Sequence, residues 1–235
     1  MPKVSRRLFL AMAGGALAAP AILRGAEDVP ISFDHMVLGI DDLGRGIAFV
    51  EERIGIRAVF GGVHPGRGTQ NALLSFGNQR YFEIIAPDPK QNVEPQFAGL
   101  ARLHEPRLVA WAIHTADIAA LSKKISEAGI SIQPPGDGSR ARPDGKLLRW
   151  KSFRLQDDRG GLLPFFIEWS RDSVHPSVDA PSGSRLERLF ALSPEPEDLA
   201  AVFRHLEVEI AIERGEKTQL RARIAGPKGQ VELSS

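Results

Sequence analysis

Cysteine is absent from all 235 residues of the chain. This excludes disulfide bonds, thiolate metal ligands and a cysteine nucleophile.

An excess of charge of one sign is also missing, because the chain has 30 Lys and Arg and 29 Asp and Glu, and the formal net charge is +1. The composition therefore predicts no nucleic-acid partner. No Gly-x-Ser-x-Gly elbow or P-loop occurs, and no helical pattern follows the glycine-rich stretch 61–68, so we expect neither a serine hydrolase of that type nor a nucleotide cofactor.

The N-terminal 26 residues resemble a signal peptide more than part of a folded domain. Arg6 and Arg7 form a twin-arginine pair, and the Ala-, Gly- and Leu-rich run after them is too short and too weakly apolar for a stable membrane span. Cleavage is expected after Ala18, Ala21 or Ala26. The pattern predicts a periplasmic or secreted protein whose partner during export is the twin-arginine translocation machinery. An uncleaved anchor or a basic terminus without a targeting role is the alternative.

From about residue 30 the chain repeats one order of elements, strand–helix–strand–strand–strand. In the copy over 31–86, Asp42 is the expected N-cap of a helix that ends at Gly55, and in the copy over 108–171 Asp117 and Gly129 take these places. The strands we expect are 31–40, 57–60, 71–76 and 80–86, then 109–115, 131–133, 146–155 and 163–169. Such repetition predicts an α+β fold with two βαβββ modules, together residues 30–172.

A fainter third copy is expected over 185–235, with strands at 185–192, 208–212, 219–224 and 229–233 around a helix over 196–206. We expect this third βαβββ-like module to cover an edge of the sheet or to supply the contact of a homodimer. Two connections separate the modules. Residues 87–106 are predicted to be a linker or lid, and residues 172–184 a surface connection.

Two polar residues interrupt otherwise apolar strands. His35 lies in Asp34-His35-Met36-Val37-Leu38, and Glu83 lies in Tyr81-Phe82-Glu83-Ile84-Ile85. Burying an imidazole or a carboxylate is costly unless the group is paired, hydrogen-bonded or bound to a metal. A histidine and a carboxylate from two strands are suited to half of a metal site, although either could also be a solvated strand residue.

At these residues the chain resembles the vicinal oxygen chelate superfamily, and in particular its glyoxalase-like branch. The segments that carry the resemblance are 34–38, 42–43, 62–73, 81–87, 142–145, 150 and 164–169. The resemblance implies paired βαβββ modules that form an open cupped sheet around a divalent metal, with ligands from the first and fourth strands of each module. It also implies substrates that offer two adjacent oxygens. The metal implied is Zn, Ni, Mn or Fe.

By this resemblance His35, Glu83 and Glu168 occupy metal-ligand positions. The fourth position, seven residues before Asp117, holds Ala110, which cannot bind a metal. Three alternatives follow. The three residues could form an open site in which a carboxylate serves as base for enolisation. His35 and Glu83 could instead hydrogen-bond in a metal-free pocket, or His64 could complete the site.

Other residues are candidates for substrate binding. Arg140 and Arg142 could clamp a carboxylate, Trp150 could stack on the substrate or belong to the core, and His64 could enter the pocket or occupy an exposed turn. The full set of predicted substrate-binding residues is His64, Asn71, His114, Arg142 and Trp150, and the predicted catalytic residues are Glu83, Glu168 and His64. We expect an enzyme of small oxygen-rich molecules, a lyase or isomerase acting through an enolate, or else a binding protein without catalysis.

Overall fold

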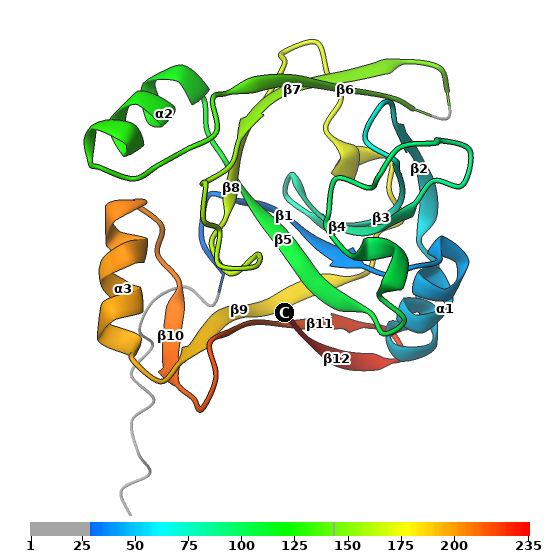
Figure 1. Cartoon of the computed structure of the whole chain (residues 1–235). Helices are drawn as coiled ribbons and strands as arrows, with labels where there is room; N and C mark the ends of the chain where they lie inside the picture. The colour runs from blue at the N-terminus through cyan, green and yellow to red at the C-terminus, as the bar shows by residue number, and fades with distance from the viewer. Residues whose placement is uncertain (1–28, 143) are drawn as a thin grey trace, which may run out of the picture.

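The computed structural model describes residues 29–142 and 144–235, so the expected signal peptide lies outside the described residues. These residues form two sheets with helices around them (Figure 1). The first sheet contains β1 (Phe33–Gly39), β2 (Val59–His64), β3 (Thr69–Gly77), β4 (Arg80–Pro87), β5 (Arg107–His114), β6 (Gly136–Ala141), β7 (Leu147–Phe153) and β8 (Phe165–Trp169). The second contains β9 (Arg185–Ser193), β10 (Ala211–Arg214), β11 (Gln219–Gly226) and β12 (Gly229–Ser234). The helices are α1 (Leu43–Ile54), α2 (Ile118–Glu127) and α3 (Pro196–His205), with short 3₁₀ turns at Leu100–Arg102 and Pro176–Val178.

The eight-stranded sheet confirms the paired modules. Its order is β2-β3-β4-β1-β5-β8-β7-β6, with β1 parallel to β4, β5 parallel to β8, and the two halves joined by the antiparallel pair β1 and β5. The sheet curls so far that its outer strands β2 and β6 meet. Gly62 has φ +142°, and a Cβ atom there would lie 2.5 Å from the carbonyl oxygen of Ala141. Only glycine fits this contact, which nearly closes the cup.

The helix boundaries follow the expected capping residues. The Asp42 side chain accepts a hydrogen bond from the Arg45 amide at 2.8 Å, and Gly55 ends α1 in the left-handed conformation with φ +79°. In the second module the Asp117 side chain accepts from the Ala120 amide at 2.9 Å. Each side chain satisfies an N–H that has no partner within the helix, which fixes where the helix begins.

One strand prediction is wrong. Residues 131–133 form only an isolated bridge between Ile132 and Leu155, and the second strand of this module is β6, after Pro134 and Pro135. The third module has the expected succession of elements but different pairing. Its order is β10-β9-β11-β12, with β9 parallel to β10, whereas β1 and β5 are parallel to the fourth strand of their own modules.

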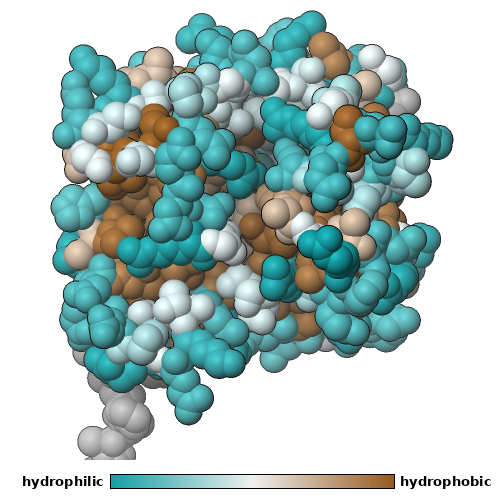
Figure 2. All heavy atoms as spheres, in the orientation of Figure 1, coloured by the Kyte–Doolittle hydropathy of each residue, from teal (hydrophilic) through white to brown (hydrophobic). Residues whose placement is uncertain are grey.

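The third module covers a face of the large sheet, not an edge. Met36 and Leu38 point away from the cup and share one hydrophobic core with Leu189 and Leu220 of the second sheet. On this face the ring of Trp111 also lies 6.3 Å from that of Phe203 in α3. Figure 2 shows an area of apolar side chains between α2 and α3 and smaller apolar areas elsewhere, while most of this surface is hydrophilic.

The connection over 172–184 is a surface connection, with Asp172, Val178 and Asp179 among its exposed residues, and it is also hydrogen-bonded to the sheet. The Ser75 amide donates to the Pro181 carbonyl, and the Ser184 hydroxyl donates to the Ser75 carbonyl, each at 2.9 Å. His175 in this segment is buried.

No helix in the described part of the chain has the length and apolar character needed to cross a bilayer.

Candidate functional site

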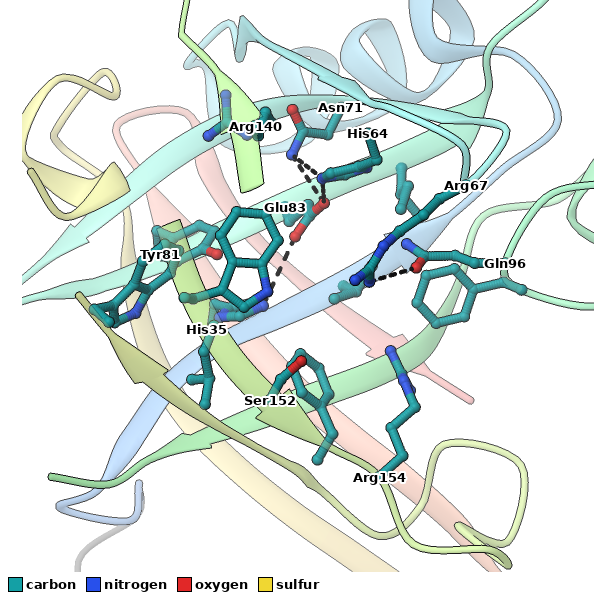
Figure 3. Close-up of a pocket in the computed structure, with 17 residues that line it drawn as sticks. His35, His64, Arg67, Asn71, Tyr81, Glu83, Gln96, Arg140, Ser152 and Arg154 are labelled. Carbon is teal, nitrogen blue, oxygen red and sulfur yellow. Dashed lines mark hydrogen bonds and ion pairs between the residues drawn. The ribbon is translucent and has the colours of Figure 1, made fainter. Parts of the chain in front are cut away.

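The concave side of the sheet encloses a cavity of about 590 Å³ (Figure 3). Because successive residues of a strand face opposite sides, alternate residues line it. The lining residues on the inner strands are His35 and Val37 of β1, Tyr81, Glu83 and Ile85 of β4, and Phe165, Ile167 and Trp169 of β8. Of the residues between them, Met36, Phe82, Ile84 and Phe166 belong to the core behind the sheet, so the strand period itself separates the site from the core.

Glu83 is the centre of the polar wall. Its Oε1 accepts a hydrogen bond from the Asn71 amide at 2.9 Å. The Nε2 atom of His35 lies 3.7 Å from Oε2, and the Nε2 atom of His64 lies 3.8 Å from Oε1. These two distances are too long for hydrogen bonds. Glu83 is only 6% exposed, so a buried carboxylate is held by one amide and faced by two imidazoles.

His64 is buried in the cup at the end of β2 and is not an exposed turn residue. Its Nδ1 atom lies 2.9 Å from the Thr69 hydroxyl, which fixes the plane of the ring. Burial lowers the pKa of His64 to about 4, and the attraction of Glu83 does not offset this effect. His64 is therefore neutral at pH 7 and leaves Glu83 without an ion pair on this side.

Asp34 orients His35 from behind. Asp34 lies in a β-bulge of β1, where the pairing with β5 shifts between Phe33 and His35. Its carboxylate contacts His35 Nδ1 at 2.6 Å, accepts from Trp169 Nε1 at 3.0 Å and lies 3.4 Å from His175 Nε2. Burial alone would raise the pKa of Asp34, but the hydrogen bonds with His175 and His35 outweigh it and hold the pKa well below its usual range. An ionised Asp34 keeps the proton of His35 on Nδ1 and turns Nε2 toward Glu83.

Three arginines make the rest of the wall electropositive. Arg67 lies between β2 and β3, Arg140 in β6, and Arg154 directly after β7. The guanidinium of Arg154 lies 4.5 Å from the ring centre of Phe165 and 5.0 Å from that of Phe97. Burial lowers the pKa of Arg140 and of Arg154, yet arginine stays protonated in proteins, so both remain cations.

The structure brings together six of the residues selected from the sequence. The cavity is lined by His35, His64, Asn71, Glu83, Arg140 and Trp150. Their catalytic and binding roles remain predictions.

Glu168 lies elsewhere, and its expected position is wrong. Phe165, Ile167 and Trp169 face the cup, so the residue between the last two points to the other side of β8. There the Oε2 atom of Glu168 accepts a hydrogen bond from the Ile118 amide at 2.8 Å. Its carboxylate thus stabilises the N-terminus of α2.

Arg142 and His114 also lie outside the cup. Arg142 forms ion pairs with Asp144, at 3.3 Å, and with Asp179. His114 is an exposed residue at the end of β5 and does not line the cavity. Arg140 lies within β6 and lines the cup, whereas Arg142 follows the last residue of this strand.

The donor set does not fit the metal site that the resemblance implies. In residues 29–142 and 144–235, no three His, Asp or Glu side chains are grouped so that they could hold a metal ion. Glu168 faces away, and the second module presents Phe165 and Ile167 to the cup, with Ala110 at the fourth ligand position. The Asn71 amide already donates to Glu83. We therefore derive no step through a metal.

Sequence reasoning missed Asp34, Arg67, Arg154 and His175. For Arg154 a signal existed, since Trp150, Ser152 and Arg154 alternate and all three line the cavity. No local sequence pattern marks the other three. A bulge places Asp34, a hairpin turn places Arg67, and a connection distant in sequence places His175.

Comparisons with known proteins agree with this architecture. The sequence profile described as a glyoxalase-like domain matches residues 33–207. A hypothetical protein from Staphylococcus aureus of known structure has a TM-score of 0.60 and 18% identity, with 86% of this chain and 84% of that chain covered. Methylmalonyl-CoA epimerase from Mycobacterium tuberculosis has a TM-score of 0.44 and 19% identity, with 62% and 92% covered. No curated protein matches the sequence. At these identities the solved structures show similarity of fold alone.

Proposed function

We propose, since the chain belongs to the glyoxalase-like domain family, that the cup binds a small carbonyl or hydroxy compound and that Glu83 removes a proton from the carbon beside its carbonyl group. The observation that carries this proposal is the Glu83 carboxylate, buried in the wall of the cavity and held at Oε1 by Asn71. The reaction class is that of a lyase or isomerase that proceeds through an enolate.

In this step the C–H bond breaks, its electron pair forms the C=C bond of the enolate, the π pair of the carbonyl moves to the carbonyl oxygen, and the proton moves to Glu83. Isomerisation is completed when Glu83 returns the proton to the neighbouring carbon, whereas return to the same carbon gives exchange alone. Oε1 is occupied by the Asn71 amide, which leaves Oε2, the oxygen nearer to His35, to accept the proton. A positioned general base of this kind contributes roughly 10²- to 10⁴-fold to the rate. The neutral state of His64 keeps this base from being neutralised by an adjacent cation.

Hydrogen–deuterium exchange tests the proposal directly. Small 2-oxo acids, 3-oxo acids and hydroxyketones would be incubated with the protein in D₂O, and loss of the α-proton signal followed by NMR. We expect exchange with the wild type and a loss of at least roughly a hundredfold in Glu83→Gln. Glu168→Gln is the matched control, because this carboxylate faces away from the cup and should leave exchange unchanged. Equal exchange by wild type and Glu83→Gln would contradict the proposal.

Binding without turnover is a second candidate function. The observation that favours it is the second module, which presents Phe165, Ile167 and Trp169 of β8 to the cup, and no acid or base from that strand. A wild-type protein that binds one of these compounds but exchanges none of their α-protons would identify it as a binding protein.

We also propose export through the twin-arginine pathway, on the basis of Arg6 and Arg7 and the weakly apolar run after them. The full chain would be expressed and its periplasmic and cytoplasmic fractions compared by immunoblotting. The wild type should reach the periplasm and lose its N-terminal segment, whereas the Arg6→Lys, Arg7→Lys double variant should stay in the cytoplasm at full length. Equal export of both chains would contradict the proposal.

A further inference from the structure

Arg67 and Arg154 enter the same part of the cavity from different elements. Figure 3 shows their side chains converging beside Gln96, with open space in front of them. Arg67 donates one hydrogen bond, to Gln96 Oε1 at 3.2 Å. The Arg154 guanidinium lies 3.9 Å from the Asp158 carboxylate, and this distance is too long for a hydrogen bond. Most of the N–H groups of these two guanidiniums therefore have no partner among the described residues.

We propose that Arg67 and Arg154 form a carboxylate subsite, so that the substrate of the cup is a small carboxylic acid with an acidic C–H beside a carbonyl. This inference rests on the proposed function, because it identifies the class of molecule that Glu83 would deprotonate. Two guanidiniums that face one cavity offer the planar, paired donors that match the oxygens of a carboxylate.

The charges of the cup favour an anion. The cationic residues that line the cavity are Arg67, Arg140 and Arg154, and the only lining carboxylate is that of Glu83, so the formal charge of the lining is 3 − 1 = +2. His64 is neutral at pH 7 and does not add to the positive charge. A substrate carboxylate between Arg67 and Arg154 would lower this charge to +1, and its planar pair of oxygens matches the donors of the two guanidiniums.

Both arginines are fixed before any ligand binds. The rings of Phe97 and Phe165 hold the Arg154 guanidinium, and stacking of this kind limits its rotamers. Arg67 is held through its backbone, because its carbonyl accepts from the Gln96 amide at 3.0 Å. Burial is the main cause of the lowered pKa of Arg154, the attraction of Asp158 opposes it, and repulsion by Arg67 adds to it, as expected for two like charges on one cavity. An anion between them would remove this repulsion.

The connection over 87–106 completes the subsite. Gln96 and Phe97 of this segment line the cavity, and the Gln91 side chain accepts a hydrogen bond from the Gly66 amide at 2.8 Å. The segment is thus attached to the hairpin that carries Arg67. The lid predicted from the sequence would lie over the carboxylate end of the substrate, whereas Glu83 faces its reacting carbon.

Calorimetric titration with matched acids and esters tests this inference. The probes are 2-oxobutyrate, acetoacetate and the methyl ester of each, with inorganic phosphate as a third oxyanion. We expect the wild type to bind at least one acid roughly tenfold more tightly than its ester, and Arg67→Gln and Arg154→Gln each to lose roughly tenfold to a hundredfold for that acid. Affinity for the ester should change little.

Arg149→Gln is the matched control, because this arginine lies in β7 near Arg154 but is exposed and pairs with Asp172 outside the cup at 3.2 Å. Its affinity for the acid should equal that of the wild type. The subsite would be refuted if each acid and its ester bound equally, if the Arg67 and Arg154 variants bound the acid like the wild type, or if phosphate bound more tightly than both acids.

The two proposals fail in different ways. If the acid binds through the arginines but no α-proton exchanges, the carboxylate subsite stands and the proton transfer by Glu83 does not. If exchange depends on Glu83 but proceeds equally well with ester and acid, the proton transfer stands and the carboxylate subsite does not.

Discussion

Replacing Asp34 with asparagine should destabilise the protein by about 3 kcal/mol at pH 7. The Asp34 side chain is 1% exposed, and its two oxygens are shared between His35 on one side and Trp169 and His175 on the other. Asparagine keeps one of these oxygens and places an NH₂ group where the other was. At least one side of the network then has a donor facing a donor.

The magnitude follows from the bonds that are lost. A hydrogen bond to a charged group contributes about 1.5–3 kcal/mol, and a buried donor left without a partner costs about 1–3 kcal/mol. Since a domain is stable by only about 5–15 kcal/mol, a loss of about 3 kcal/mol is easily measured by urea denaturation followed by tryptophan fluorescence. Asp172→Asn is the control, because Asp172 is exposed and its pair with Arg149 should contribute less than about 1 kcal/mol.

The difference between wild type and Asp34→Asn should also depend on pH. The pKa of Asp34 is held below its usual range in the folded protein, so its stabilising effect is present above the ordinary aspartate pKa of about 4 and declines as the pH falls below that value. The two stabilities should therefore converge in acid. A loss under about 1 kcal/mol at pH 7, or a difference that grows as the pH falls, would refute the reasoning about this network.

Two further predictions concern stability. The pKa of His64 is about 4 in the folded protein and near 6.5 in the unfolded chain, so the unfolded chain binds more protons between these pH values. The wild type should therefore lose stability as the pH falls through this window, and His64→Gln should lose less. Parallel urea-denaturation profiles of the two proteins against pH would contradict this prediction. Phe203→Ala should cost about 3–5 kcal/mol in urea denaturation, because Phe203 is buried against Trp111 beneath the large sheet. Phe60→Ala, at a half-exposed phenylalanine, should cost far less, and equal losses would argue against a core shared with the third module.

The parts of the fold that sequence patterns predicted well are those fixed by neighbouring residues. Asp42, Gly55 and Asp117 mark helix ends because each acts within one turn of its own position. The strand of β6 was missed since Gly136–Ala141 is a polar, largely exposed edge strand without apolar alternation. The pairing of the third module depends on contacts between distant segments, which succession alone does not specify.

For the candidate site, prediction succeeded where one strand could be followed residue by residue. His35 and Glu83 were found because polar residues in buried strands are costly, and both line the cavity. The family resemblance places Glu168 among the metal ligands, whereas the strand period of two puts Phe165, Ile167 and Trp169 inward and Glu168 outward. The role of Asp34 could not be predicted. Adjacent residues of a regular strand face opposite sides, and only the bulge in β1 lets Asp34 contact the ring of His35.

The two halves of the curled sheet share one architecture but contribute different kinds of side chain to the cup. Every imidazole and carboxylate that lines the cup comes from the first half, whereas the second half presents Trp150, Arg154, Phe165 and Trp169. Under the proposed function, substrate choice could change through β7 and β8 while the wall that holds Glu83 stays intact. A designer would then vary the second half alone and keep β1 and β4 as they are.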